Sequence, residues 1–599
     1  MSADRVRLRD LLRGVASTLP DFTTTQRGLW NLLRLKPDTT LSIGLRFAQL
    51  AAAQPQATAL RFEDRSWSYA EFNAWANRIA HALAARGVGP GDAVALLFEN
   101  RPEALACALA VVKLGAIAAM LNPQQRGELL AHSIGLVKAR AVVVGDECRA
   151  ALESTRYAPS SSSDLLHYRD GDGGAPEGYL DLRTESAAAR ADNPQQTAMI
   201  RLRDPCFYIF TSGTTGLPKA SRMTHYRWMR SLAGVGQLAV RMRRDDVLYC
   251  PLPLYHNNAL TVSWSATLSA GCTLALGRKF SASRFWDEIR SVDATAFCYI
   301  GELCRYLLNQ PPKPGDREHR VRLVIGNGLR AELWDEFQQR FGIERICEFY
   351  GASEANLAFV NGFGLARTAG FCPMPFAIVE FDAENDAPRR AAGGFLQRVA
   401  KGGVGLLITE VTERAPFDGY TDPKASDAKL LRNVFKAGDC WFNSGDLVRD
   451  QGFSHIQFVD RVGDTFRWKG ENVATTEVEG VLNQFATITE AVVYGVQLPN
   501  ADGRAGMAAL SLSADFDGAA LAAHLCARLP AYAVPLFVRL RSAQETTATF
   551  KFRKLELKQQ GFDPSMVNEP LYVLRDRQRG YERLDAETFA AIQRNELRF

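Results

Sequence analysis

The chain has 599 residues, which is too long for one hydrophobic core and predicts two to four domains. Its hydrophobic content of 47% and charged content of 23% place it among ordinary soluble globular proteins. The net charge of +5 is small for this length and argues neither for nor against nucleic acid. No basic stripe with interleaved aromatic residues occurs, so no nucleic-acid partner is expected.

The first 39 residues form a basic amphipathic segment. Arginines at positions 5, 7, 9 and 13 interrupt any apolar core, so we expect no secretory signal. In 4–15 and 24–36, arginines alternate with large apolar residues, namely Leu11, Leu12, Trp30, Leu32, Leu33 and Leu35. Two interpretations stay open: peripheral contact with an anionic membrane, or a solvated helix packed on its own protein.

An alternation of helices and apolar strands begins near residue 68. Helical periodicity over 68–86 is followed by a buried strand at Ala93–Phe98, and the apolar run Ala104–Leu121 predicts a buried helix that leads into a strand. This run is of borderline length for a membrane span, but it contains Lys113 and Gly115. The same rhythm returns at 265–350, which predicts an α/β fold with mostly parallel, helix-covered sheets.

Two segments have the composition of loops. The cysteines show no pattern of a disulfide framework. Residues 158–178 and 310–317 are rich in Ser, Gly, Pro and Asp. The eleven cysteines are spread singly, with no C-x-x-C pair, so neither zinc nor disulfides are favoured and reduced thiols in the cytoplasm are expected.

The stretch 208–219 is the most informative part of the chain. An apolar, aromatic strand leads into Thr-Ser-Gly-Thr-Thr-Gly-Leu-Pro-Lys at 211–219. Gly213 and Gly216 permit a sharp turn, so that hydroxyls and free N–H groups point into one concavity suited to phosphate oxygens. A polar surface turn rarely needs four hydroxyls and a cation. The segment is not the common P-loop, since Pro218 precedes Lys219 where that pattern has Gly-Lys.

Three other segments carry candidate chemistry. His256 ends a proline-stiffened stretch at 250–258 after a strand, where α/β proteins bind ligands. In 348–356, Tyr350 offers a flat ring and Glu354 a carboxylate that suits Mg²⁺ beside a phosphate cradle. Asp446 and Arg461 supply an acceptor and a donor suited to ribose hydroxyls.

One segment favours a different class of protein. A predicted strand at Val321–Ile325 leads into Gly326-Asn-Gly-Leu-Arg-Ala331, which matches G-x-G-x-x-A and is predicted to open a helix. Glu348 lies twenty residues past Gly328, as in dinucleotide-binding folds. A nicotinamide oxidoreductase is therefore one alternative, although it leaves the hydroxyl-rich loop unexplained.

The tail beyond about residue 465 predicts a small α+β domain. A helix at 475–485, strands near 490–498 and 507–513, a helix at 518–529 and a strand at 536–541 follow one another. The join is short, and Gly463 gives it the backbone freedom of a hinge. The predicted domains are the N-terminal segment at 1–39, a large domain at 40–461 and a mobile lid at 462–599.

Together and in this order, these segments resemble the AMP-forming acyl- and aryl-ligase superfamily. More narrowly, the chain is similar to the long-chain and very-long-chain acyl-CoA synthetases related to fatty acid transport proteins. The resemblance covers about residues 40 to 575, and its motifs are 211–219, Pro253–Asn258, Tyr299–Glu302, Gly326–Arg330, Glu348–Glu354, Asp460–Val473 and Thr549–Lys551. It implies ATP, Mg²⁺ and coenzyme A, a fatty acid substrate, and two steps through an acyl adenylate.

The resemblance also implies residue roles. The phosphates of ATP would be held by Thr211, Ser212, Gly213, Thr214, Thr215, Gly216 and Lys219. The adenine pocket would be formed by Gly326, Asn327, Gly328, Tyr350, Gly351 and Ala352. Ser353 would contact the α-phosphate, Glu354 would bind Mg²⁺, and Asp446 and Arg461 would hold the ribose. The residues expected to take part in catalysis are Lys551, Glu354, His256 and Thr211, with Lys551 swinging in for adenylation.

Three positions depart from the family's pattern. Ala355 stands where glycine is usual, and its methyl group is expected to narrow the acyl entrance. Ser353 replaces threonine and keeps the hydroxyl. Ala548 stands where glycine is common in the loop that carries Lys551, and this is expected to stiffen the loop. Two further alternatives stay open: a ligase that delivers the acyl group to a carrier protein, and a membrane-bound fatty acid transporter with vestigial catalysis.

Overall fold

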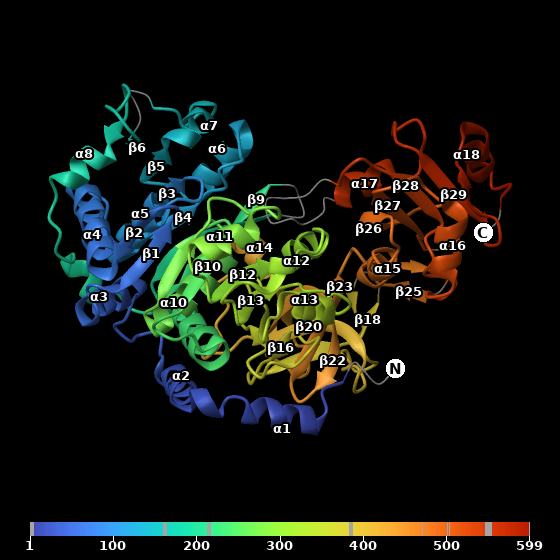
Figure 1. Ribbon diagram of the computed structural model, residues 1–599, viewed down its shortest axis with the longest axis horizontal. Coiled ribbons are helices and arrows are strands. Elements are labelled where there is room, and N and C mark those ends of the chain that lie inside the picture. The colour runs from blue at the N-terminus through green and yellow to red at the C-terminus, as the bar shows by residue number, and fades with distance from the viewer. Residues whose placement is uncertain are drawn as a thin grey trace.

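The computed structural model describes residues 5–159, 164–212, 217–382, 387–469, 471–499, 501, 503–544 and 554–597. Figure 1 shows a large N-terminal body and a smaller C-terminal body, with two helices running along the lower edge. The predicted mixture of helix-covered sheets is confirmed.

The first sheet has the strand order β7-β6-β5-β3-β4-β8-β9, and all neighbours are parallel except β8 and β9. Its strands are β3 (Ala93–Leu97), β4 (Ile117–Met120), β5 (Ala141–Gly145), β6 (Leu166–Asp170), β7 (Leu180–Asp181), β8 (Pro205–Ser212) and β9 (Pro218–Thr224). The helices around it are α4 (Tyr69–Ala85), α5 (Pro102–Lys113), α6 (Gly127–Leu136), α7 (Arg149–Glu153) and α8 (Leu182–Ala187). Central strands such as β3 are buried throughout, as expected for a parallel sheet covered on both faces.

The second sheet has a parallel half and an antiparallel half that meet at β14. The parallel order is β1-β11-β10-β12-β13-β14, and its strands are β1 (Thr58–Phe62), β10 (Val247–Cys250), β11 (Thr273–Leu276), β12 (Ala296–Ile300), β13 (Leu323–Asn327) and β14 (Arg345–Tyr350). The antiparallel half continues through β15 (Phe359–Val360), β16 (Gly370–Phe371), β23 (His455–Arg461), β22 (Cys440–Gly452), β20 (Val404–Glu410) and β17 (Phe376–Val379).

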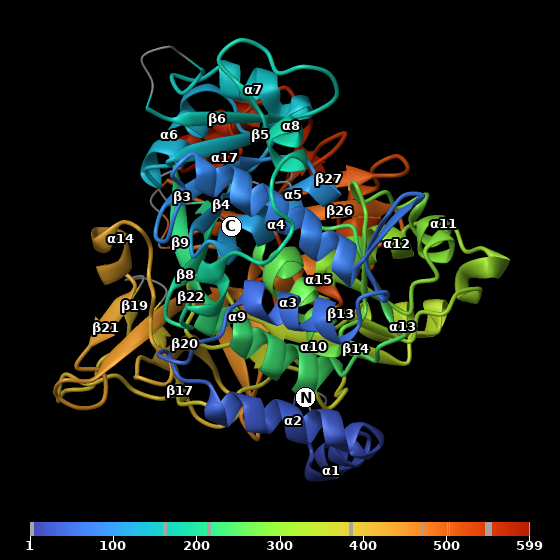
Figure 2. The ribbon, with the colours of Figure 1, turned by 90° about the vertical axis from the view of Figure 1, so that its left-hand side faces the viewer.

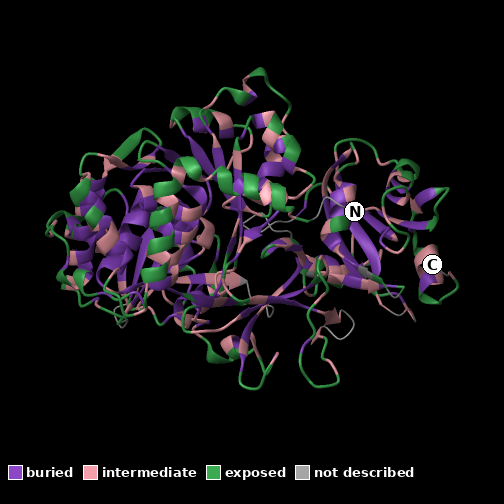
Figure 3. Cartoon of the chain, turned by 90° about the horizontal axis from the view of Figure 1, so that it is seen from below, coloured by how far each residue is buried: buried purple, intermediate pink, exposed green. Residues whose placement is uncertain are grey.

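Helices cover this second sheet and link it to the first. They are α3 (Ile43–Ala53), α9 (His225–Ser231), α10 (Trp264–Ala270), α11 (Phe285–Ser291), α12 (Gly301–Leu308), α13 (Trp334–Phe341) and α14 (Pro423–Asp427), with π-helical turns η4 (Leu232–Val240) and η5 (Asn258–Ser263). One continuous core runs from α3 and α4 through the parallel strands to Phe349. Figure 3 shows this buried interior with half-buried and exposed helices around it.

The C-terminal part has a core of its own. It holds α15 (Thr475–Leu482), β26 (Ile488–Val496), β27 (Ala505–Leu512), α16 (Gly518–Cys526), β28 (Phe537–Leu540), α17 (Lys554–Gln560), β29 (Leu571–Asp576), β30 (Gly580–Arg583) and α18 (Ala586–Gln593). The buried side chains of this core begin at Phe466, three residues after the predicted hinge glycine. Every element predicted from the tail is present, with ends displaced by at most three residues.

The N-terminal segment forms α1 (Leu8–Ala16) and α2 (Phe22–Arg34). In Figures 1 and 2 both helices lie end to end along the lower edge of the N-terminal body. Within the described ranges, no helix combines the length and apolar composition that crossing a bilayer requires. The run Ala104–Leu121 is the buried end of α5 followed by β4, as predicted.

Two predictions about local structure are wrong. The segment after Gly328 does not open a helix, since α13 begins at Trp334. The predicted loop at 158–178 contains β6, whose sequence Leu-His-Tyr-Arg-Asp has only one aliphatic residue. This strand is buried because it pairs with β5 inside the sheet, and Tyr168 packs into the main core. Burial of polar residues by tertiary pairing left no alternating signal in the sequence.

A buried histidine at the start of α9 makes the fold sensitive to acid. The N–H of Ile43 donates to Nδ1 of His225 at 3.2 Å, and burial lowers the pKa of His225 to about 3. Because the pKa of His225 in the folded state is below the ordinary histidine value of 6.5, this residue favours folding above pH 6.5. This contribution is lost as pH falls from 6.5 toward 3, by about 1.4 kcal/mol per pH unit.

We therefore expect His225→Asn to flatten the acid side of the stability profile. The side-chain oxygen of Asn keeps an acceptor near the position of Nδ1, but it does not titrate. The variant should be less stable than the native chain at neutral pH, while its thermal midpoint should fall less steeply below pH 6.5. Calorimetry over a pH series measures this, and parallel acid profiles for the two proteins would contradict it.

Candidate active site

The candidate residues gather where neighbouring parallel strands end. Strands β10, β12, β13 and β14 lie side by side, so their carboxyl ends share one edge of the sheet. His256 follows β10, Gly326 and Asn327 end β13, and Tyr350 ends β14. This edge is the usual position of a ligand site in an α/β fold. Segments nearly one hundred residues apart in the sequence are thereby brought together.

The segment 350–354, directly after β14, is the centre of these contacts. The hydroxyl of Tyr350 donates to Oδ2 of Asp446 at 2.6 Å, and Arg461 lies opposite Asp446 across β22 and β23, with Nε 3.6 Å from Oδ1. Burial raises the pKa of Tyr350, and the charge of Asp446 adds to the shift. Asp446 is thus held between a phenol and a guanidinium beside the ring of Tyr350.

The other end of this segment is linked to β8 and β9 through Tyr420. Thr211 and Lys219 are paired residues on these two strands, and Lys219 Nζ lies 5.8 Å from the centre of the Tyr420 ring. The Tyr420 hydroxyl donates to Oε1 of Glu354 at 2.8 Å. Burial and the charge of Glu354 raise the pKa of Tyr420, so its phenol stays a proton donor. Tyr420 therefore joins the lysine strand to the carboxylate.

Four predicted phosphate-binding residues, Gly213, Thr214, Thr215 and Gly216, lie outside the described residues, as does Lys551. Ser212 ends β8. Ser212 and Pro218, the described residues on either side of these four, are paired across β8 and β9. Within the described residues, only one oxygen of Glu354 has a hydrogen-bond partner. One carboxylate beside a phosphate site is the donor set with which proteins bind Mg²⁺, so the chemistry of the site fits that ion.

A partly buried arginine fixes the backbone of the same segment. Arg227 Nη2 donates to the carbonyl oxygens of Ser353 at 2.8 Å and Ala355 at 2.6 Å, and the Ser221 hydroxyl donates to the Ser353 carbonyl at 2.8 Å. Burial lowers the pKa of Arg227, and the charges of Asp418 and Glu354 oppose that shift. The side chains of Ser353 and Glu354 are therefore presented from a backbone that β9 and α9 hold in place.

The glycine-rich segment forms a tight wall beside Tyr299. A Cβ on Gly326 would lie 2.3 Å from the Tyr299 carbonyl oxygen, and Gly328 has a φ of +80°. The N–H groups of Gly328 and Leu329 both donate to Oε1 of Glu348, the second at 3.1 Å. The N–H groups that a dinucleotide fold would offer to a pyrophosphate are thus occupied. Together with the late start of α13, this removes the support for the oxidoreductase alternative.

His256 lies at the same edge, half-buried, in a loop braced from the first sheet. The Asn100 side chain donates to the Leu252 carbonyl at 2.7 Å and accepts from the Leu254 N–H at 2.8 Å. Two residues after His256, Asn258 donates to Asn327 Oδ1 at 3.1 Å. The histidine loop and the glycine-rich wall are therefore one connected structure.

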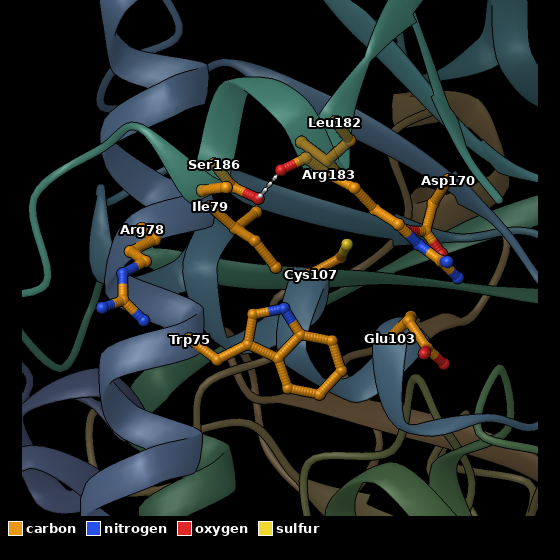
Figure 4. A pocket seen from close by; sticks show the side chains of 10 residues that line it. Trp75, Arg78, Ile79, Glu103, Cys107, Asp170, Leu182, Arg183 and Ser186 are labelled. Atoms are coloured by element: carbon orange, nitrogen blue, oxygen red, sulfur yellow. Dashed lines mark hydrogen bonds and ion pairs between the residues drawn. The ribbon is translucent and has the colours of Figure 1, made fainter. Parts of the chain in front are cut away.

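Reasoning from the sequence missed Tyr420 and Arg227. Tyr420 lies in an unremarkable stretch, where no local motif marks it, and Arg227 resembles any basic residue of a surface helix. Sequence reasoning also considered Glu348 only as a dinucleotide ligand. The described chain contains a cavity of about 250 Å³ between α4, α5 and α8, lined by Trp75, Glu103 and Asp170 among others (Figure 4). None of the predicted site residues lines it.

Comparisons with known proteins agree with the geometry. Residues 47–393 match the AMP-binding enzyme family, and residues 477–551 match the AMP-binding enzyme C-terminal domain. The chain is 51% identical to medium/long-chain-fatty-acid–CoA ligase FadD6 of Mycobacterium tuberculosis over 96% of this chain and 95% of that protein. It is 38% identical to mouse (Mus musculus) long-chain fatty acid transport protein 6 over 92% and 90%.

A solved structure of the same fold is the anthranilate CoA ligase AuaEII in complex with anthranoyl-AMP. It aligns with a TM-score of 0.75 at 20% identity, over 88% of this chain and 98% of that one.

The role of Glu348 can be tested without turnover. Glu348→Ala leaves the N–H of Gly328 and the buried N–H of Leu329 without their acceptor and should lower the affinity for AMP about tenfold or more, measured by calorimetry. Burial raises the pKa of Glu348 to about 8, so its neutral form predominates at neutral pH. The neutral isostere Glu348→Gln should therefore bind AMP nearly as the native chain does. If Gln is as damaging as Ala, the carboxyl group has another role.

Proposed function

The chain belongs to the AMP-binding enzyme family, and we propose that it joins long-chain fatty acids to coenzyme A in two steps through an acyl adenylate. The observation that carries this is that two sets of contacts meet at residues 350–354. Tyr420 lies beside Lys219 and donates to Glu354. Tyr350 donates to Asp446, which also lies beside Arg461. The extent and identity of the match to FadD6 support the same substrate class.

The first step overcomes two obstacles. A carboxylate cannot expel oxide, and an anion must approach the polyphosphate of ATP. Attack of the carboxylate oxygen on the α-phosphorus releases pyrophosphate and converts that oxygen into part of an AMP leaving group. Residues 211–219 and Lys551 would neutralise the charge that develops, since fixed cations and donors act strongly in a water-poor site. Glu354 would hold Mg²⁺, which when bound neutralises part of the phosphate charge.

The nucleotide would be held along the edge of the sheet. Tyr350, Gly351 and Ala352 would face the base together with the wall at 326–328, while Asp446 and Arg461 would hold the ribose. His256 would lie beside the acyl carboxylate. In the second step the thiolate of coenzyme A attacks the acyl carbon and AMP departs, so no further activation of a phosphate is needed.

The two steps would use two orientations of the C-terminal domain, 462–599. In the orientation described, Arg330 Nη2 lies 3.0 Å from Glu479, and the Tyr306 hydroxyl donates to Glu490 at 3.2 Å. These contacts join the glycine-rich segment and α12 to α15 and β26. A rotation about Gly463, which has a φ of +86°, would exchange them for another set. Gly463→Pro is a poor probe of this hinge, because proline cannot adopt the positive φ of the orientation described, so the variant would disturb that orientation itself.

The relatives support an apolar substrate. The relatives include long-chain fatty acid transport proteins, so uptake coupled to activation is a second candidate function. Long-chain acids partition into bilayers, and we propose a cytoplasmic enzyme that works at a membrane surface. The methyl group of Ala355 would narrow the acyl entrance relative to the glycine usual in the family.

Lys551→Ala should separate the two half-reactions. It should abolish pyrophosphate exchange, because the cation that assists attack on the α-phosphate is lost. It should largely spare thioester formation from a supplied acyl adenylate. The exposed Lys436→Ala is the matched control and should leave both unchanged. Equal loss of both half-reactions in the Lys551 variant would contradict this division of roles.

The substrate class is tested by AMP release across carboxylic acids of increasing chain length, with and without coenzyme A. We expect release to be greatest with long-chain acids and to depend on coenzyme A. Acyl transfer to a carrier protein without coenzyme A would favour the carrier-delivering ligase. Fatty acid uptake by reconstituted vesicles in the absence of ATP would favour a transporter.

A further inference from the structure

The two N-terminal helices expose most of their large apolar side chains and are fully buried against the protein only at glycine. The fully buried residues of α1 and α2 are Gly14 and Gly28 alone. A Cβ on Gly14 would lie 2.7 Å from the Phe363 carbonyl oxygen, and one on Gly28 would lie 2.8 Å from Gln237 Cβ. Both helices therefore contact the body closely through glycine, which is the reverse of an ordinary surface helix.

The outward faces are continuous and apolar. Leu8, Leu12 and Val15 recur at helical spacing on α1, and Phe22, Leu29 and Leu33 do so on α2, with Leu19 between the helices and Trp30 beside the second set. Leu12 is 60% exposed, Leu33 67% and Trp30 55%. These eight side chains are half of the sixteen large apolar residues exposed in the described part of the chain. Such a concentration marks a surface with an apolar partner.

The excess positive charge of the chain lies in the same segment. Residues 1–36 hold seven Arg or Lys and three Asp, a net +4 of the chain's total of +5. On α2, helical spacing places Arg27 and Arg34 on one flank of the apolar face. The Arg34 guanidinium lies 4.2 Å from the Trp30 ring centre. Asp21, the acidic residue between the helices, pairs with buried Arg241 at 3.3 Å and so faces the protein. The outward surface is therefore both apolar and cationic.

The N-terminal segment is attached on the side of the loop that contains His256. Helix α2 packs on η4, with Leu32 over Gly234 and Asn31 donating to Gln237 at 2.8 Å. In turn η4 packs on η5, which begins two residues after His256. One layer of protein thus separates the exposed apolar face from the loop that would hold the fatty acid carboxylate. Figures 1 and 2 show both helices at the edge of the molecule, with no other element beneath them.

We propose that α1 and α2 form a membrane-docking strap that inserts Leu8, Leu12, Leu19, Phe22, Leu29 and Leu33 into the interface of an anionic bilayer. The helices span nine and thirteen residues, well short of the about 20 that a span needs, so docking is parallel to the surface. The arginines at 9, 13, 27 and 34 would lie at the level of the lipid headgroups. This deepens the proposed function by naming the surface and the lipid class from which the substrate is collected.

Flotation of the full chain with vesicles tests the strap without any turnover. The native protein should float with phosphatidylcholine–phosphatidylglycerol vesicles and much less with phosphatidylcholine alone, and added salt should weaken binding. Leu12→Gln/Leu33→Gln should lower binding about tenfold or more. Arg9→Gln/Arg34→Gln should lower binding to the anionic vesicles by about fivefold for each arginine.

Matched controls lie elsewhere on the surface. Met199→Gln/Phe453→Gln removes two equally exposed apolar side chains, and Arg190→Gln/Arg389→Gln removes two exposed arginines. Neither control should change flotation. All variants should keep the native thermal midpoint, because every mutated side chain is exposed. AMP binding in solution should also stay native, so a failure of the strap is distinguishable from a failure of the proposed enzyme.

Three results would overturn the proposal. The first is a native chain that floats with neither kind of vesicle, and the second is a leucine double variant that floats as well as the native chain. The third is a native dimer that becomes monomeric in the leucine variant, measured by light scattering, without vesicle binding by either. In that case the apolar face is an interface between two copies of the chain.

Discussion

The site depends on the end of one strand, β14, where the parallel and antiparallel halves of the second sheet meet. The few residues that follow it contact three other parts of the chain. Tyr350 bonds to Asp446 of β22, the Ser353 carbonyl accepts from Ser221 of β9, and Glu354 accepts from Tyr420. A parallel strand must end at the edge where its neighbours end, and an antiparallel neighbour then returns beside it. This geometry places the groups proposed to bind phosphate, ribose and a metal ion around one short segment.

Buried polar side chains keep this arrangement in a single conformation. Arg227 holds two carbonyls of the segment 353–355, Glu348 holds two N–H groups of the glycine-rich wall, and Asn100 braces the loop that leads to His256. None of these three needs to touch a substrate. Displacing the backbone that any of these side chains holds would cost free energy, because a buried donor or acceptor would be left unpaired. The reacting groups are thus preorganised by residues that take no part in the chemistry.

The proposed role of the N-terminal helices follows from where a fatty acid substrate is found. A fatty acid is dilute in water and concentrated in bilayers, so an enzyme that acts on it gains from contact with a membrane. The strap has glycine toward the protein, aliphatic and aromatic side chains outward, and nearly all of the chain's excess positive charge. Its attachment to η4 connects that surface to the layer beside His256. Peripheral docking and adenylate chemistry would then occupy adjoining sides of one domain.

The sequence by itself determined the helices and strands with strong periodicity, such as α4 and β3, the order of the nucleotide motifs and the family. These features are local, because a cap, a turn glycine or an apolar repeat depends only on residues close together in the sequence. Only the tertiary structure decided that Tyr420 and Arg227 contact the segment 353–355, that β6 is buried, that Glu348 accepts from the N–H groups after β13, and that the apolar faces of α1 and α2 point outward. Each of these depends on contacts between residues far apart in the chain, whose energies leave no pattern in a single stretch of sequence.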